Sequence, residues 1–259
     1  MGRFASTVAY YECARPQYGA AFFAAVAREL GFDRSQRLLD VGAGPGILAI
    51  GFAPACGEVV GVDPEPAMIE AARAAAGRAG VAATFIEGRF EDMAASLGAF
   101  DVVTIGRAIH WLDPEPARVA LDRVVAPRGR ILVCNAGSVE DGRNPWLEAF
   151  NAVRDRWKDD RPAHDRNAFF AGGRFVPMGT ISVEAAYAVP VERLADRILS
   201  MSTSSPERLG DEVPAMRSAM REALAPFAAA GVIDEIVEAR AEVFDRRGGN
   251  RSAAPALDL

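Results

Sequence analysis

The sequence has almost no lysine: Lys158 is the only one, so 28 of the 29 cationic residues are arginine (29 − 1). The chain also has 35 acidic residues, which gives a net charge of −6 (29 − 35). Proteins that bind nucleic acid usually carry an excess of positive charge. The charge balance therefore disfavours DNA or RNA as the main partner, and we interpret the arginine bias as compositional.

Cysteine and histidine are also scarce. The three cysteines, Cys13, Cys56 and Cys134, are far apart and odd in number, which is typical of a reducing compartment and predicts no disulfide framework. His110 and His164 are the only histidines, too few for the usual His/Cys zinc sites. We expect no metal centre.

Long apolar runs are missing as well. The first residues, MGRFASTVAYYE, lack the apolar stretch of a signal peptide, and the run Ala20–Ala27 ends at Arg28, far short of a membrane span. With 259 residues, 50% of them hydrophobic and 25% charged, the composition is that of a folded globular chain. We expect a cytoplasmic protein with no membrane partner.

The first half of the chain alternates between short apolar runs and longer alanine-rich stretches. The runs predict strands, at Arg37–Val41, Glu58–Asp63, Ala83–Glu87, Phe100–Ile105 and Arg130–Cys134. The stretches predict helices, at Gly19–Leu30, Gly46–Ala55, Pro66–Gly80 and Pro114–Ala126. Strands buried on both faces and alternating with helices are typical of an α/β fold with a doubly wound, mostly parallel sheet.

The pattern changes after Asn135. It predicts further helices and strands, in chain order Trp146–Lys158, Thr180–Val189, Val191–Met201, Pro214–Ala230 and Asp234–Phe244, with a polar loop at Asp159–Pro177. We predict an N-terminal cap segment over residues 1–30 and one domain over 31–245. A helical insertion lies near 190–230, and a flexible tail covers 246–259.

The most specific motif is Leu38–Ile47, LLDVGAGPGI, in which a strand runs into a glycine turn and a helix. Glycines allow a ligand to approach the backbone, and free N–H groups at a helix start can meet an acceptor. Considered alone, the turn has a second explanation, in which a connection from strand to helix needs glycine for steric reasons and binds no ligand. A dinucleotide fingerprint is disfavoured because Ile47 occupies its third small position and Pro45 removes an N–H group.

Asp63 ends the second strand, seventeen residues after Gly46 (63 − 46). A carboxylate there can accept both hydroxyls of a ribose. The structural alternative is an N-cap for the following helix. The pairing with the glycine turn at this distance favours ribose binding.

Five segments together resemble the class I S-adenosylmethionine-dependent methyltransferases, of the methyltransferase type 11 kind. They are LLDVGAGPG, VVGVDPEPAMIEAA, FIEGRFEDM, FDVVTIGRAIHWLD and VVAPRGRILV. The resemblance implies a Rossmann-like fold with a seven-stranded, mostly parallel sheet and a helical cap. It also implies S-adenosyl-L-methionine as cofactor and S-adenosyl-L-homocysteine as product. This cofactor carries a sulfonium cation and no phosphate, so acids suit its site better than a phosphate cradle.

The resemblance assigns each cofactor-binding residue a part of the cofactor. Asp40 would face the methionine amino group, and the turn would line the methionine and ribose through Gly42, Ala43, Gly44 and Gly46. Asp63 would hold the ribose. The adenine would lie against Pro64 and Met68, with Phe90 and Glu91 at its edge, although GRFEDM departs from the commoner Gly-Asp-Ala pattern. The sulfonium would lie above Gly106, Arg107 and Ala108.

The acceptor is expected beside His110 and Trp111, after the fourth strand. A histidine titrates near neutrality and can act as the base, although a structural histidine explains the position too. The segment from Tyr10 to Tyr18, with HWLD and SMSTSS, resembles a trans-aconitate methyltransferase-like subgroup. That likeness implies Arg15 near the cofactor carboxylate, Tyr18 near the acceptor, and a small organic acid as one candidate acceptor.

The sequence thus predicts methyl transfer to a small molecule by in-line displacement, with oxygen favoured over nitrogen and carbon as the attacking atom. One alternative is a protein of the same fold that binds the cofactor for another purpose, such as a cyclase or a regulatory binder. A nicotinamide-dependent oxidoreductase and an RNA methyltransferase fit less well. No particular oligomeric state is predicted.

Overall fold

The structure is a computed structural model that describes residues 10–11, 14–158, 169–201 and 203–247. The chain divides into two compact units. The sheet unit comprises Tyr18–Asn135, Ala163–Val183 and Arg240–Leu259, and the helical unit comprises Met1–Gln17, Ala136–Pro162 and Glu184–Ala239. The predicted domain boundaries, including the cap at 1–30, stay a prediction. Most of the predicted flexible tail, residues 248–259, lies outside the described residues.

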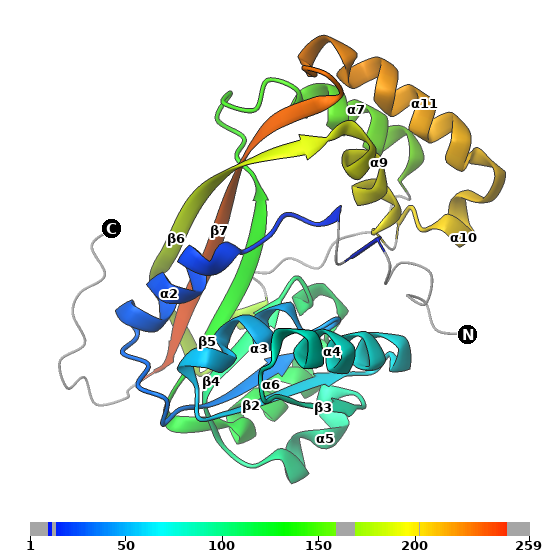
Figure 1. The fold of residues 1–259 in the computed structure, drawn as a ribbon. Helices are drawn as coiled ribbons and strands as arrows, with labels where there is room; N and C mark the ends of the chain where they lie inside the picture. The colour runs from blue at the N-terminus through cyan, green and yellow to red at the C-terminus, as the bar shows by residue number, and fades with distance from the viewer. Residues whose placement is uncertain (1–9, 12–13, 159–168, 202, 248–259) are drawn as a thin grey trace. The chain divides into compact units, whose positions relative to one another are not determined.

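Seven strands form one sheet in the order β3-β2-β1-β4-β5-β7-β6, as predicted for this fold class. The strands are β1 (Arg37–Val41), β2 (Glu58–Asp63), β3 (Thr84–Glu87), β4 (Phe100–Gly106), β5 (Val125–Ser138), β6 (Phe175–Pro190) and β7 (Val232–Arg246). The pairs β2–β3, β1–β2, β1–β4 and β4–β5 are parallel. Figure 1 shows β5, β6 and β7 as the long strands, and each contributes residues to both units.

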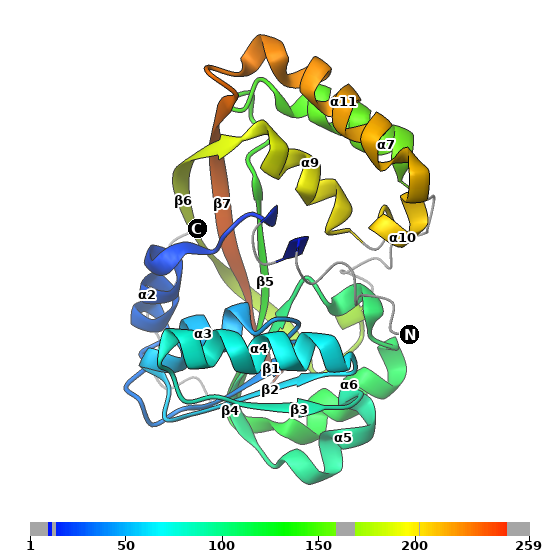
Figure 2. The same ribbon diagram turned by 45° about the vertical axis from the view of Figure 1, so that its right-hand side comes forward.

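Helices cover both faces of the sheet within the sheet unit. Figure 2 shows α3 (Ile47–Phe52) and α4 (Pro66–Ala79) on one side of β1–β3, with α5 (Phe90–Leu97) and α6 (Pro114–Val124) on the other. α2 (Gly19–Glu29) packs on α3, where the rings of Phe23 and Phe52 meet edge to face at 4.9 Å. The doubly wound arrangement predicted from the alternating pattern is therefore confirmed.

Strand β1 shows how the core positions the site. Leu39 and Val41 are fully buried in the apolar cluster that includes residues of α5 and α6. Since successive side chains of a strand point to opposite faces, Leu38 and Asp40 point toward α3 and α4. A carboxylate thus lies on the buried face directly before the glycine turn.

The helical unit has its own apolar core. Four helices supply most of it, namely α7 (Leu147–Trp157), α9 (Val191–Leu199), α10 (Pro206–Leu209) and α11 (Val213–Leu224). Trp146 is fully buried there and its indole N–H donates to the Asp234 carbonyl of β7 (3.0 Å). This donor is satisfied, as a buried indole requires.

Four sequence expectations need correction. The helix at Phe90–Leu97 was not predicted, because its first residues belong to the motif GRFEDM, which was interpreted only as part of the family resemblance. The helix expected to reach Ala230 ends at Leu224, where Pro226 favours a 3-10 turn. β5 extends well beyond Arg130–Cys134, and β6 begins at Phe175, inside the expected loop. Residues 159–168 of that loop lie outside the described residues.

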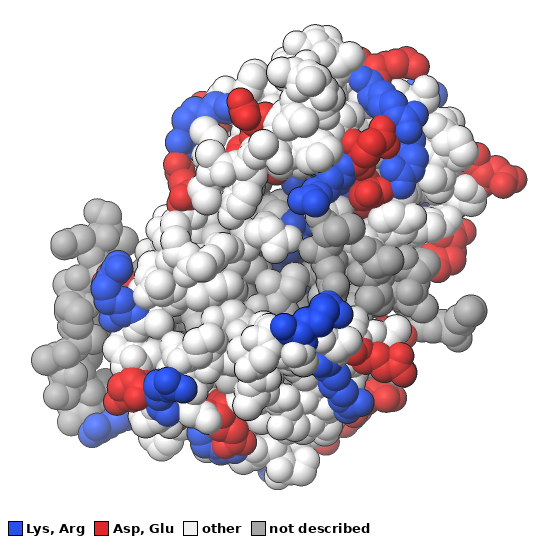
Figure 3. Space-filling model, viewed as in Figure 1, with Lys and Arg blue, Asp and Glu red and all other residues white. Residues whose placement is uncertain are grey.

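Charged side chains of both signs stand close together in several places on the face shown in Figure 3. The ion pairs of the described residues include Arg143 with Glu184 and Arg221 with Glu192. Among the helices of the described residues, none is both long and apolar enough to cross a membrane.

Candidate active site

The predicted site residues of the sheet unit gather at one edge of the sheet. Because β1, β2, β3 and β4 are parallel neighbours, their carboxyl ends lie at the same edge. β1 lies between β2 and β4, so the strand order reverses between β1 and β4. In open α/β sheets, ligands bind beyond the carboxyl ends at such a switch point. At this edge Asp63 ends β2 and Gly106 ends β4, and the glycine turn follows the last residue of β1.

The three glycines of the turn have different steric surroundings. All have positive φ, at 64° for Gly42, 53° for Gly44 and 83° for Gly46. A Cβ on Gly42 would lie 2.5 Å from the Ala108 Cβ, and one on Gly46 would lie 2.9 Å from the Phe85 ring. A Cβ on Gly44 would meet only the Met68 sulfur, at 4.0 Å. Gly42 and Gly46 are thus needed for packing, whereas the space beside Gly44 can admit a ligand.

Asp63 ties the end of β2 to the glycine turn. Its Oδ2 accepts the Gly44 N–H (2.8 Å) and its Oδ1 accepts the Glu65 N–H (2.9 Å). The N-cap of α4 is Glu65, so the alternative that Asp63 is the N-cap of this helix is wrong. A carboxylate offers about four acceptor positions, and two suffice for these bonds.

Asp40 lies beneath the turn and is only 1% exposed. Its Oδ2 accepts the Ala49 N–H in the first turn of α3 (3.1 Å), and its Oδ1 accepts the Thr104 hydroxyl (2.8 Å). These contacts fasten the start of α3 to β1 and β4. The described contacts of Asp40 are thus structural, and its predicted role toward the amino group stays a prediction.

Burial raises the pKa of both acids. For Asp40, burial raises the pKa to about 7, against the opposing effect of the bonds from Thr104 and Ala49, and the charge of Asp63 adds to the rise. The pKa of Asp63, which is 8% exposed, is also raised by burial, partly offset by the Glu65 and Gly44 N–H groups. Two neighbouring buried acids favour a cation or a proton between them.

The residues expected near the adenine differ in exposure. Met68 is buried on α4 and Pro64 is exposed in the preceding turn. Phe90 packs in the apolar core, and the Glu91 Oε1 accepts the Asp113 N–H (3.2 Å). The Glu91 bond joins the start of α5 to the residue before α6, and no finding tests the predicted adenine contact of Phe90 and Glu91.

The end of β4 has an unusual backbone. Arg107 has φ of 55°, a left-handed conformation that costs a non-glycine residue about 1–2 kcal/mol. Its N–H donates to the Cys134 carbonyl (3.3 Å), and its guanidinium lies 5.3 Å from the centre of the Tyr18 ring. The Tyr18 hydroxyl oxygen is 3.5 Å from where a Gly106 Cβ would stand. Tyr18, Gly106 and Arg107 are therefore neighbours, in a strained segment of the kind that clusters at functional sites.

His110 and Trp111 follow in the 3-10 helix η2 (Ile109–Trp111). His110 is exposed, Trp111 is 42% exposed, and their ring centres are 5.0 Å apart. Ile109 and Leu112 anchor this helix in the core. The sequence prediction of a histidine and an indole near the carboxyl end of β4 is met, while their contact with an acceptor is untested.

Arg15 belongs to the helical unit, unlike the other predicted site residues. Its Nη2 donates to the Ser200 carbonyl (3.0 Å), and its guanidinium lies over the Tyr11 ring at 5.2 Å. Its predicted position near the cofactor carboxylate stays a prediction.

One contributor to the site, Thr104, escaped the sequence reasoning, and it binds Asp40 across β1 and β4. The Ala108 side chain, which was expected near the sulfonium, fills the space that a Gly42 side chain would occupy. Thr104 is a polar residue inside the apolar run FDVVTI, which was the available signal. In the described part of the chain, no three His, Cys, Asp or Glu residues are grouped so as to hold a metal ion.

These residues fit a cationic nucleoside cofactor. Asp63 has acceptor capacity for ribose hydroxyls, Gly44 leaves space at the turn, and two buried acids favour positive charge. A diphosphate would meet these same acids and a turn without the Pro45 N–H. Fold and site together define a Rossmann-like protein of the class I methyltransferase type.

Comparison with known proteins agrees with this class. Residues 39–133 match the family described as "Methyltransferase domain". An uncharacterized methyltransferase of Mycobacterium tuberculosis is 33% identical over 168 residues, which is 63% of this chain and 62% of that protein. The chain thus spans about 62% of the length of this relative.

Solved structures share the fold. A putative type II methyltransferase from Anaeromyxobacter dehalogenans has a TM-score of 0.64 at 20% identity, covering 90% of this chain and 97% of its own. A methyltransferase from Thiobacillus denitrificans in complex with S-adenosyl-L-homocysteine has a TM-score of 0.55 at 16% identity, covering 95% and 99%. The recognition made from the sequence is confirmed over residues 39–133, which match the methyltransferase domain family, and the solved structures share its Rossmann-like fold.

Proposed function

We propose that the protein transfers the methyl group of S-adenosylmethionine to an oxygen atom of a small acid or hydroxyl compound. The observation that carries this proposal is the bond from the Gly44 N–H to the Asp63 carboxylate at the switch point, beside an open glycine. It joins the two halves of the predicted cofactor motif in one place. The family match supports the reaction class.

The cofactor supplies an electrophilic methyl group on a positively charged sulfur. Asp63 would accept the two ribose hydroxyls with its remaining acceptor positions, while Pro64 and Met68 contact the adenine and Phe90 and Glu91 flank its edge. The turn from Gly42 through Ala43 and Gly44 to Gly46 would line the methionine part. Asp40 would keep that turn in place and balance the positive charge, and Gly106, Arg107 and Ala108 would lie below the sulfur.

The acceptor side would be formed by Tyr18, His110 and Trp111. Methyl transfer is a displacement in which the oxygen–carbon bond forms as the carbon–sulfur bond breaks, and the bonding electrons pass to sulfur. The protein aligns the two reactants and excludes water. His110 would take the proton of the attacking hydroxyl, and the aromatic faces of Trp111 and Tyr18 would position the acceptor. Arg15 is proposed to approach the cofactor carboxylate.

Calorimetry tests the cofactor assignment. The protein should bind S-adenosylmethionine and S-adenosylhomocysteine and should not bind NAD. Binding of NAD alone would favour the oxidoreductase alternative.

An acceptor screen tests the reaction. Small acids, phenols and amines are incubated with the cofactor, and S-adenosylhomocysteine is quantified. Product formed with acids or phenols supports oxygen methylation. Tight cofactor binding without product from every acceptor would favour the regulatory or cyclase alternative.

A further inference from the structure

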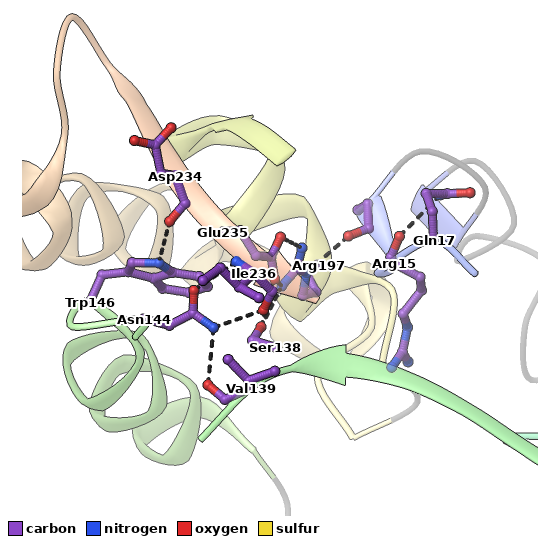
Figure 4. Close-up of polar contacts among 11 residues, drawn as sticks. Arg15, Gln17, Ser138, Val139, Asn144, Trp146, Arg197, Asp234, Glu235 and Ile236 are labelled. Atoms are coloured by element: carbon purple, nitrogen blue, oxygen red, sulfur yellow. Dashed lines mark hydrogen bonds and ion pairs between the residues drawn. The ribbon is translucent and has the colours of Figure 1, made fainter. Parts of the chain in front are cut away.

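Two carboxylates, one in each unit, have little exposure and different kinds of partner. In the helical unit, Glu235 is 1% exposed and pairs with Arg197, whose Nη1 donates to Oε1 (2.7 Å) and Nη2 to Oε2 (2.8 Å). Ser138 donates its hydroxyl to the same Oε1 (2.6 Å), as Figure 4 shows, and the Arg197 Nε donates to the Ala14 carbonyl (3.0 Å). In the sheet unit, Glu91 is a half-buried residue whose side chain is only 7% exposed.

The Glu91 carboxylate binds a backbone N–H at the start of the neighbouring helix. Its Oε1 accepts the Asp113 N–H (3.2 Å), and its Oε2 lies 3.8 Å from the Arg89 Nε. Asp113 is the N-cap residue of α6, which packs against α5. In a capping box, the third residue of the helix supplies this bond to the N-cap N–H. In α6 that position is Pro116, which has no acceptor side chain, and a carboxylate from α5 provides the bond instead.

The helix dipole does not by itself explain this arrangement. Acids are favoured near a helix N-terminus, and both Glu91 and Asp92 lie in the first turn of α5. The Asp92 carboxylate is also close to the Arg89 Nε, at 3.9 Å, yet its side chain is 76% exposed. Burial of a carboxylate is costly unless it is hydrogen-bonded. The burial of Glu91 therefore goes with its bond to Asp113.

This bond holds one end of the segment Arg107–Asp113, which connects β4 to α6. At the other end of the segment, the Arg107 N–H donates to the Cys134 carbonyl of β5 (3.3 Å). The exposed rings of His110 and Trp111 lie between the two fixed ends. The place of both rings thus depends on how firmly the ends are held.

We propose that Glu91 is a positioning residue that anchors the end of this segment and so fixes His110 and Trp111 at the edge of the sheet. The inference rests on the proposed function, which gives the two rings their role toward the acceptor. In this role Glu91 acts through the Asp113 backbone. The residues that carry the argument all belong to the sheet unit.

Three variants separate the anchor from the charge. Glu91→Ala removes the acceptor, Glu91→Gln keeps an oxygen that can accept the Asp113 N–H, and Asp92→Ala is the matched control because it removes the other acid of the same helical turn. In hydrogen exchange followed by NMR, the Asp113 amide should exchange about tenfold faster in Glu91→Ala, because the bond that protects it is lost. Glu91→Gln and Asp92→Ala should exchange like the unaltered protein. Equal exchange in Glu91→Ala and the unaltered protein would overturn the anchor.

NMR relaxation then measures how firmly the two ring-bearing residues are held, again without ligand. The backbone amides of His110 and Trp111 should have order parameters of about 0.85 in the unaltered protein, Glu91→Gln and Asp92→Ala. In Glu91→Ala they should fall below about 0.6, the range of flexible segments. Faster exchange at Asp113 with unchanged order parameters would overturn the positioning role.

The acceptor screen connects the anchor to the reaction. At saturating S-adenosylmethionine, Glu91→Ala should form S-adenosylhomocysteine about tenfold more slowly from the acceptors that the unaltered protein methylates, because alignment of the reactants is lost. Glu91→Gln should recover most of the rate, and an unchanged rate in Glu91→Ala would overturn the role in the reaction. No product from the unaltered protein with every acceptor would overturn the proposed function, whereas exchange and relaxation decide the anchor on their own.

Discussion

Among the residues that the structure describes, the buried charged residues of the helical unit, Arg197 and Glu235, have opposite charges. Those of the sheet unit, Asp40 and Asp63, have the same charge. The opposite charges neutralise each other in a bidentate pair. Burial raises the pKa of Asp40, and the like charge of Asp63 adds to this rise. We interpret the paired charges as structural, and the two buried acids as part of the proposed site for the cofactor's positive charge.

The largest effect should come from breaking only one side of the opposite pair. Arg197→Met leaves Glu235 buried without its partner, which typically costs about 3–5 kcal/mol. Urea unfolding should show this loss, and adding Glu235→Leu should restore most of it. If the single variant were as stable as the double variant, the pair would not be desolvated as described.

The glycine turn offers a second contrast, between binding and stability. Gly44→Ala and Gly80→Ala both place a side chain at positive φ, at 53° and 65°, with no atom nearer than 4.0 Å. Each should lose about 1 kcal/mol of stability from backbone strain. Only Gly44→Ala should weaken S-adenosylhomocysteine binding, by about 30-fold or roughly 2 kcal/mol, since its methyl group fills the ligand space. Equal affinity in the two variants would place the cofactor elsewhere.

The like-charged acids predict a pH dependence of stability. An unfolded aspartate ionises near pH 4, whereas buried Asp40 keeps its proton to about pH 7. The folded state therefore binds more protons between these values, and stability falls as the pH rises from about 4 to about 7. Asp40→Asn should lose about 2 kcal/mol less unfolding free energy between pH 5 and pH 8 than the unaltered protein, as measured by urea unfolding.

The matched control for this pH dependence is Glu70→Gln, which removes an exposed carboxylate of α4. It should leave the slope as it is. An Asp40→Asn protein with an unchanged slope would show that Asp40 ionises normally in the folded state.

The smallest expected effect concerns His110. His110→Ala should lower kcat by about tenfold, which is less than the usual contribution of a general base, with S-adenosylhomocysteine affinity unchanged. Once an acceptor is known, steady-state rates and calorimetry separate the two quantities. A parallel loss of affinity and turnover would make His110 structural.

The sequence predicted the parts of the fold that depend on neighbouring residues. β1 and β2 have the predicted bounds, because each is a continuous apolar run ended by a glycine or an aspartate. The family resemblance predicted the residues that meet at the switch point. α5 was missed because its first half coincides with the motif GRFEDM, which was interpreted only as part of the family resemblance.

Contacts between distant segments were beyond the sequence reasoning. The bond between Thr104 and Asp40 depends on β1 and β4 being paired in register, with Asp40 opposite Thr104. The meeting of Ala14, Ser138, Arg197 and Glu235 depends on four segments spread over the chain. No local pattern marks Arg197 in a chain with so many arginines.

The most direct test of the cofactor site is calorimetry of S-adenosylhomocysteine with the unaltered protein, Asp63→Asn and Asp63→Ala. Asp63 is expected to accept charge-assisted bonds from ribose, each worth about 1.5–3 kcal/mol. Asp63→Ala should therefore weaken binding by about 100-fold or more, because two such bonds are lost, with Asp63→Asn in between because it keeps one acceptor oxygen. Equal affinity in all three proteins would contradict the ribose role of Asp63 and the site built around it.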